Sequence, residues 1–186
     1  MLRHDRPVER LVEELAAARI GGTFNQYADS PIRRARLTDY LERHETAPVL
    51  LVGEAAGYRG ARISGLPFTS ERQLTGEGPA EATATIVQRV LDELGLAEHV
   101  LLWNVVPTHP GTETTNRRPT RAEVEASLPF LRALRRGRQT IAVGRLAAAV
   151  TQAPYVRHPS HGGAVAFRAG LLSFAAGARE VRRFSV

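Results

Sequence analysis

The sequence predicts an α/β protein, a three-layer α/β/α sandwich around a short four-stranded parallel sheet. Three observations support this fold class. Short apolar runs alternate with segments of helical periodicity. The apolar runs end at Gly, Asn or Pro. The chain of 186 residues is 43% hydrophobic and 24% charged, which is typical of a globular protein. Alternation of this kind implies parallel strands with helices on both faces. We expect a single domain spanning residues 1–186.

The expected strands are the apolar runs at residues 48–52, 100–106, 140–143 and 155–156. The expected helices carry apolar residues three and four positions apart, at residues 5–19, 31–44, 79–94, 120–136, 146–150 and 163–176. Asp5 is an expected N-cap, Thr120 and Glu123 form a capping box, and Gly95 is an expected helix stop. The segments 53–78 and 107–119, rich in glycine, proline and polar residues, are expected to be loops.

The charged residues narrow the classes of function. The chain has 25 basic residues, all of them Arg, and a net charge of +6; it has no Lys and no Cys. These absences exclude lysine Schiff-base chemistry, disulfides and cysteine-held metal clusters. The basic balance suits a polyanionic partner such as nucleic acid. Arginines on predicted helix faces are expected to be solvated: Arg33, Arg34, Arg135, Arg136 and Arg138.

Nothing in the sequence indicates a membrane protein. The longest apolar runs, such as residues 49–52, are far shorter than the ~18 residues that span a bilayer. The N-terminal residues are charged from Arg3 onward, and no secretory segment follows them. We therefore expect a cytoplasmic protein without a membrane partner.

Three unusual segments follow predicted strands. In parallel α/β sheets, ligands bind beyond the carboxyl ends of the strands, so these segments should converge. Residues 53–57 place Glu54 directly after a strand, as a catalytic carboxylate or as an exposed loop acid. Phe68, further along the same loop, could stack on a base or pack in the core.

The other two segments carry an amide and an imidazole. Asn104 lies at a strand end, where its amide could cap a turn or pair with a planar ligand. His158 could donate a hydrogen bond to a developing anion or be a satisfied structural residue. His158 and His161 are spaced as metal ligands can be, but no third ligand is close in sequence, and we expect no metal.

Taken in order, the three segments resemble the motifs of the uracil-DNA glycosylase superfamily. The first is Gly53-Glu54-Ala55-Ala56-Gly57 followed by Gly65-Leu66-Pro67-Phe68, the second is Asn104, and the third is His158-Pro159-Ser160. The resemblance covers about residues 48–175, which leaves residues 1–47 as a helical N-terminal extension. The iron–sulfur type and the single-strand-selective monofunctional type look most similar, and the former shares the run at residues 116–120. The cluster cysteines are missing, Ala55 stands where the latter type has a catalytic Asn, and Ala56 replaces the motif proline.

The resemblance implies a monofunctional enzyme that hydrolyses the N-glycosidic bond of uracil in single- or double-stranded DNA. It implies that His158 donates to uracil O2, and that Glu54 stabilises the sugar cation or orients water. The base would be held by Gly53, Ala55, Phe68 and Asn104. The DNA would be contacted by Arg59, Arg62, Arg117, Arg118, Arg157, Ser160 and His161. We expect no cofactor and a monomer; the alternatives are a glycosylase for hypoxanthine or xanthine and a catalytically weak module that binds uracil-containing DNA.

Overall fold

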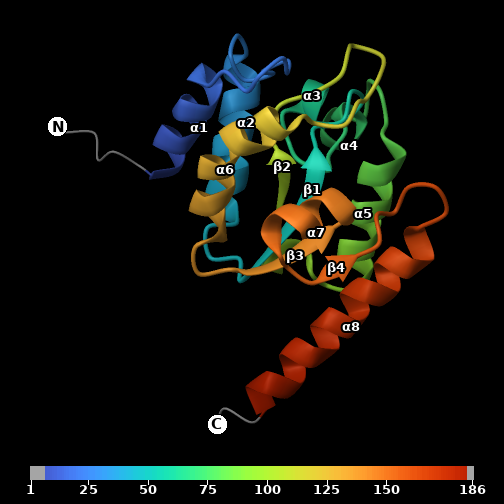
Figure 1. The fold of residues 1–186 in the computed structure, drawn as a ribbon. Coiled ribbons are helices and arrows are strands. Elements are labelled where there is room, and N and C mark those ends of the chain that lie inside the picture. The colour runs from blue at the N-terminus through green and yellow to red at the C-terminus, as the bar shows by residue number, and fades with distance from the viewer. Residues whose placement is uncertain (1–6, 184–186) are drawn as a thin grey trace.

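A four-stranded parallel sheet forms the centre of the protein (Figure 1). The computed structural model describes residues 7–183, and side chains up to residue 175. The strand order is β2-β1-β3-β4, and the strands are β1 (Val49–Ala55), β2 (Val100–Val106), β3 (Gln139–Val143) and β4 (Tyr155–Val156). All three strand pairs are parallel, as the sequence predicts. The register sets Gly53 beside Asn104, so two of the three motifs meet where β1 and β2 end.

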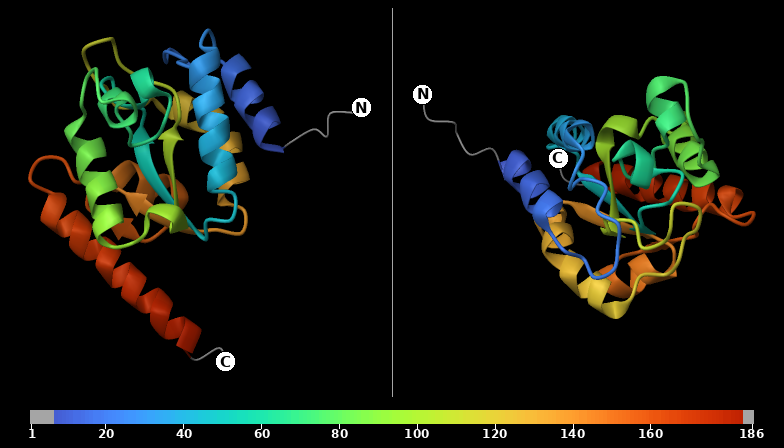
Figure 2. Two further views of the ribbon diagram at one scale, coloured as in Figure 1. Left: turned by 180° about the vertical axis from the view of Figure 1, so that it is seen from behind. Right: turned by 90° about the horizontal axis from the view of Figure 1, so that it is seen from above.

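Helices cover both faces of the sheet and complete the three predicted layers. The helices are α1 (Pro7–Ala17), α2 (Pro31–Arg43), α3 (Ala61–Ser64), α4 (Glu71–Thr75), α5 (Ala82–Glu93), the 3₁₀ turn η1 (Ala97–His99), α6 (Arg121–Arg135), α7 (Arg145–Thr151) and α8 (Ala164–Arg183). Figure 2 shows α6 and α7 on one face and α2, α5 and α8 on the other. The core between the layers includes Leu51, Trp103 and Phe167, which are fully buried. No helix within residues 7–183 is long and apolar enough to cross a membrane.

Several boundaries differ from the expected ones. β1 continues to Ala55 because the ladder with β2 extends through Gly53 and Ala55, so Glu54 lies on the strand rather than in a loop. The expected loop 53–78 contains α3 and α4, and α4 begins at a capping box in which Ser70 pairs with Gln73. α5 begins three residues after Pro79, with Glu81 at the N-cap position. The predicted cap Asp5 lies outside the described residues.

The prediction that the helix-face arginines are solvated is wrong for four of the five. Arg33 donates from Nε to Ile63 O at 2.8 Å, and Arg34 donates to Tyr27 O at 2.8 Å. Arg135 donates to Thr151 O, and Arg138 donates to Glu45 O and Leu134 O. Carbonyl groups at turns and helix ends have no intrahelical donor, and the guanidinium groups supply one. Arg136 is exposed, as expected.

Candidate active site

Two cavities that share lining residues lie at the carboxyl end of the sheet. The smaller, about 50 Å³, is lined by Glu54, Ala55, Gly57, Ala61, Phe68, Glu81, Thr83, Asn104 and His158. The larger is an open groove of about 610 Å³ that includes Glu54, Ala55, Glu81 and His158 and extends to an arginine-rich rim. The structure therefore brings the three sequence motifs to one place.

Phe68 and Asn104 line the smaller cavity, and Gly53, which lines neither cavity, lies against both of them. A Cβ at Gly53 would overlap the Phe68 ring and lie 2.7 Å from Oδ1 of Asn104, so only glycine lets these groups meet. Asn104 is 4% exposed, and within the described part of the chain its side-chain amide makes no hydrogen bond. The amide lines the smaller cavity, so both its donor and its acceptor are available to a ligand there.

Phe68 is held in an unusual backbone conformation. Its φ is +49°, in the left-handed region, which costs of order 1–3 kcal/mol for such a residue. Hydrogen bonds on both sides fix the turn: Ser64 Oγ donates to Thr69 O at 2.7 Å, and Gln88 Nε2 donates to Phe68 O at 3.1 Å. The aromatic ring is thus fixed at the cavity wall by its surroundings.

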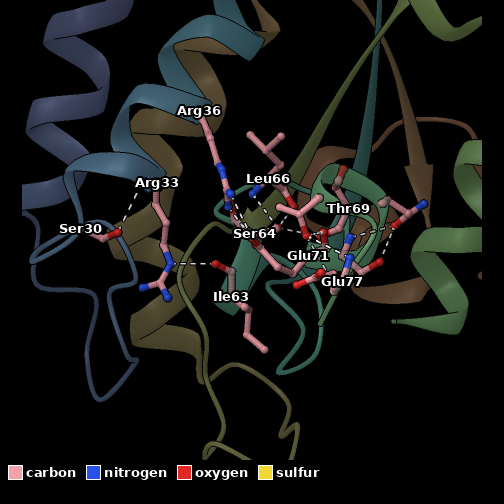
Figure 3. Close-up of polar contacts among 12 residues, drawn as sticks. Ser30, Arg33, Arg36, Ile63, Ser64, Leu66, Thr69, Glu71 and Glu77 are labelled. Atoms are coloured by element: carbon pink, nitrogen blue, oxygen red, sulfur yellow. Dashed lines mark hydrogen bonds and ion pairs between the residues drawn. The ribbon is translucent and has the colours of Figure 1, made fainter. Parts of the chain in front are cut away.

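Helix α2 anchors the segment that carries Phe68 (Figure 3). Besides the bond from Arg33 to Ile63, Arg36 donates to Ser64 O at 3.2 Å and makes a two-pronged ion pair with Glu71, with both distances 2.9 Å. Such bidentate pairs fix direction as well as distance. The sequence extension before residue 48 therefore takes part in shaping the site.

His158 is oriented by the residue two positions further on. Its Nδ1 accepts from the backbone N–H of Ser160 at 3.2 Å and lies 2.8 Å from Ser160 Oγ. A backbone N–H can only donate, so in the neutral ring the proton is on Nε2. Burial lowers the pKa of the His158 imidazole, and the neighbouring His161 lowers it further. The ring is therefore a neutral donor through Nε2 at physiological pH.

The site contains two carboxylates, of which sequence reasoning identified one. Glu54, on β1, is half-buried and lines both cavities. Glu81 also lines both, although it comes from the start of α5. Burial raises the pKa of the Glu81 carboxyl. Its sequence context, Pro79-Ala80-Glu81, indicates only a helix start, so no signal in the sequence could have found it.

His109 is a second residue that sequence reasoning missed. It is fully buried, and its ring nitrogens lie 2.7 Å from Ala56 O and 2.7 Å from Thr112 O. Its backbone forms a two-bond antiparallel bridge with Phe24. His109 thus ties the turn after β1 to the loop after β2.

The predicted DNA-contacting residues divide into two groups. Residues lining the larger cavity are Arg117, Arg118, Arg157, Ser160 and His161, joined by Arg145 and Tyr155, which were not predicted. Arg59 and Arg62 line neither cavity. Arg62 pairs with Glu113 at 2.9 Å and lies over the Phe24 ring, and Arg59 lies over Tyr58. Arg117 is itself paired with Glu123, at 2.6 and 2.8 Å.

A narrow pocket with an aromatic wall, a free amide, a donor imidazole and carboxylates, opening into an arginine-rimmed groove, suits an enzyme that acts on one base of a polyanion. A family model described as the uracil DNA glycosylase superfamily matches residues 42–176. The chain belongs to that superfamily, which supports its assignment as a DNA glycosylase.

The fold has a counterpart among solved structures. The crystal structure of wild-type Pedobacter heparinus SMUG2 is similar, with a TM-score of 0.66 and 11% sequence identity, over 95% of this chain and 98% of that one. A comparison with curated proteins gives no match. At this identity the likeness concerns the fold, and the argument for function rests on the family and on the site.

Proposed function

We propose that this protein hydrolyses the N-glycosidic bond between uracil and deoxyribose in DNA, releasing the base and leaving an abasic site. The observation that carries the proposal is that Asn104, His158 and the Phe68 ring line the same small cavity. An amide has an acceptor and a donor, which match N3–H and O4 of uracil. Cytosine presents the opposite pattern at these atoms and would leave buried groups unpaired.

The imidazole and the carboxylates suit the charges that develop in this reaction. As the bond breaks, the sugar becomes a cation and the base becomes an anion. The neutral His158 ring donates from Nε2 to the base oxygen O2, where the negative charge gathers. Glu54 stabilises the sugar cation by its negative charge. Because the donor strengthens as the charge grows, it acts mainly on the transition state.

The groove rim suits the phosphates on either side of the reacting nucleotide. Arg118, Arg145 and Arg157 are exposed there, and guanidinium groups bind phosphate oxygens well. A base stacked in a duplex cannot enter the small cavity, so the nucleotide must be flipped out, at a cost of a few kcal/mol.

The reaction should leave the strand intact. Glycosylases that also cut the strand commonly attack the sugar with an amine, and this chain has no lysine. The terminal amine of Met1 is an amine that remains, and it lies outside the matched residues 42–176, so attack by water is the expected route.

The test is incubation of the purified protein with matched oligonucleotides that contain uracil, hypoxanthine or xanthine. Alkali treatment then scores abasic sites, and borohydride is added to a parallel reaction to trap amine adducts. We expect cleavage of the uracil strand after alkali only, and no trapped adduct. Release of hypoxanthine or xanthine in preference to uracil would overturn the uracil assignment, and strand breaks before alkali would overturn the monofunctional one.

A further inference from the structure

Glu81 lines the smaller cavity, and the proposed reaction assigns no role to its carboxylate. Glu81 comes from the N-cap of α5, but its side chain makes no cap hydrogen bond. Its carboxylate leans over the turn after β1: a Cβ at Gly57 would lie 2.5 Å from Oε2 of Glu81, and a Cβ at Gly60 would overlap that atom. The two glycines therefore make the space that this side chain occupies.

Nothing in the described residues pairs with this carboxylate. No hydrogen bond or ion pair within residues 7–183 reaches the Glu81 side chain, and the residue is half-buried. Carboxylates in structural roles are paired when they are buried, because burying an unpaired charge is costly. Glu71 and Glu123 follow that rule, each in a two-pronged contact with an arginine. Glu81 does not, and it lies in the cavity that holds Asn104 and His158.

The first motif offers no other group to activate water. Its positions 55, 56 and 57 are Ala, Ala and Gly, which have no side-chain hydrogen-bonding group, and Tyr58 and Arg59, which follow them, line neither cavity. Glu54 is needed as a full negative charge facing the sugar, and accepting a proton would remove that charge. A second carboxylate allows the two tasks to be divided.

We propose that Glu81 is the general base that activates the attacking water in the proposed glycosylase reaction. A lone pair of the water oxygen forms the new bond to C1′ of the deoxyribose. The bond between C1′ and the base nitrogen breaks, and its electron pair leaves with the base as an anion held by His158. The water proton passes to the Glu81 carboxylate and afterwards to solvent. The inference rests on the proposed function, because it names a residue for the same site.

The surroundings of Glu81 favour this role. A general base works best when its pKa is close to the working pH, and burial moves the pKa of Glu81 in that direction. The other titratable and charged groups that line the same two cavities come from β1, the loop after β2, α7, β4 and the loop after β4. They are Glu54, Arg117, Arg118, Arg145, Tyr155, Arg157, His158 and His161. Glu81 acts as a base only when its carboxylate is ionised. Because its pKa is raised, the rate should begin to fall on the acid side at a pH above the pKa of an ordinary glutamate.

The experiment compares single-turnover rates on a uracil oligonucleotide at saturating protein. Glu81→Gln should lower the rate by about 10²–10⁴, the range for losing a general base, without weakening DNA binding measured by fluorescence anisotropy. The acid limb of the pH–rate profile should shift or disappear in this variant. Glu77→Gln is the matched control, because Glu77 is an exposed glutamate in the same loop, outside both cavities.

A second variant guards against a folding defect. Gly57→Ala keeps the Glu81 charge but pushes the carboxylate aside, and it should lower the rate at least 10-fold with thermal unfolding close to that of wild type. Wild-type protein that releases uracil, with Glu81→Gln within 3-fold of it, would overturn the role of Glu81 alone. Wild-type protein that releases none of the tested bases would overturn the proposed function and this inference with it. If another base is released, the same variants are compared on that base.

Discussion

Replacing His158 with Ala tests the electrostatic part of the proposed reaction. Nδ1 of the ring is engaged by the Ser160 N–H, so Nε2 is the proton-bearing atom, and Ala removes this donor. Losing one donor to a developing anion typically costs about 2.7–4 kcal/mol of transition-state stabilisation, which corresponds to about 10²–10³ in rate. DNA affinity should change little, because the anion does not exist in the bound ground state.

The assay is single-turnover release of uracil at saturating protein, together with binding measured on the same oligonucleotide. His99→Ala is the matched control. His99 is exposed and ends η1 just before β2 begins, so it lies at the opposite end of the sheet from the site. Ser160→Ala should lose less than 10-fold, because the backbone N–H still fixes the tautomer of His158. A His158→Ala rate within 3-fold of wild type would refute the donor role, and a large loss of DNA affinity would show that the residue acts in binding.

Three further predictions concern binding and stability. A plot of log DNA affinity against log salt concentration should have a negative slope of about 0.7–0.9 for each phosphate contact. In an anisotropy titration, Arg157→Gln should make that slope shallower by the amount expected for about one contact. A flat salt response would argue against the groove as the DNA site. Arg117 lowers the pKa of Glu123 from 4.5 to about 2, so this pair should stabilise the fold above pH 4.5 and lose that effect as the pH falls toward 2. Glu123→Gln should lower the free energy of unfolding by about 1.5–3 kcal/mol at pH 7 and reduce its acid dependence in urea titrations; an unchanged acid dependence would contradict the linkage. Gly53→Ala should cost about 1–3 kcal/mol by overpacking against Phe68 and Asn104, and a calorimetric scan matching wild type would contradict the close approach.

The parts of the fold that were predictable from sequence are those set by local patterns. β2 has the expected bounds, 100–106, because it is apolar at every position except Asn104 and is buried along its whole length. The Thr120–Glu123 capping box forms and begins α6, with the Glu123 side chain accepting from Thr120 N at 2.8 Å. The convergence of residues 53–57, Asn104 and His158 follows from strand polarity alone, since parallel strands end at the same edge.

The parts that were not predictable depend on contacts between distant segments. Glu81 is 27 residues beyond Glu54, and it reaches the same cavity only because the chain between them turns back over the end of β1. His109 is also far in sequence from its partner, since it lies in a loop with three prolines, 53 positions after Ala56. Nothing local indicates that its ring bonds the Ala56 carbonyl. The positive φ of Phe68 was also invisible, because left-handed conformations are read from Gly, Asn or Asp rather than from an aromatic residue.

The N-terminal extension illustrates how a region outside the motifs contributes to the site. Arg33 and Arg36 bond carbonyls of the α3 region, Tyr27 OH donates to Gly65 O at 2.9 Å, and the Phe24 backbone pairs with His109. These contacts end on segments 57–71 and 107–112. The first contributes Gly57, Ala61 and Phe68 to the small cavity, and the second contributes Pro110 to the larger one. Each carbonyl left without its donor would cost about 1–3 kcal/mol, which is comparable with the strain held at Phe68. The Phe68 wall therefore keeps its shape because helix α2 and the turn before it are packed beside the segment that carries Phe68, although none of their residues lines either cavity.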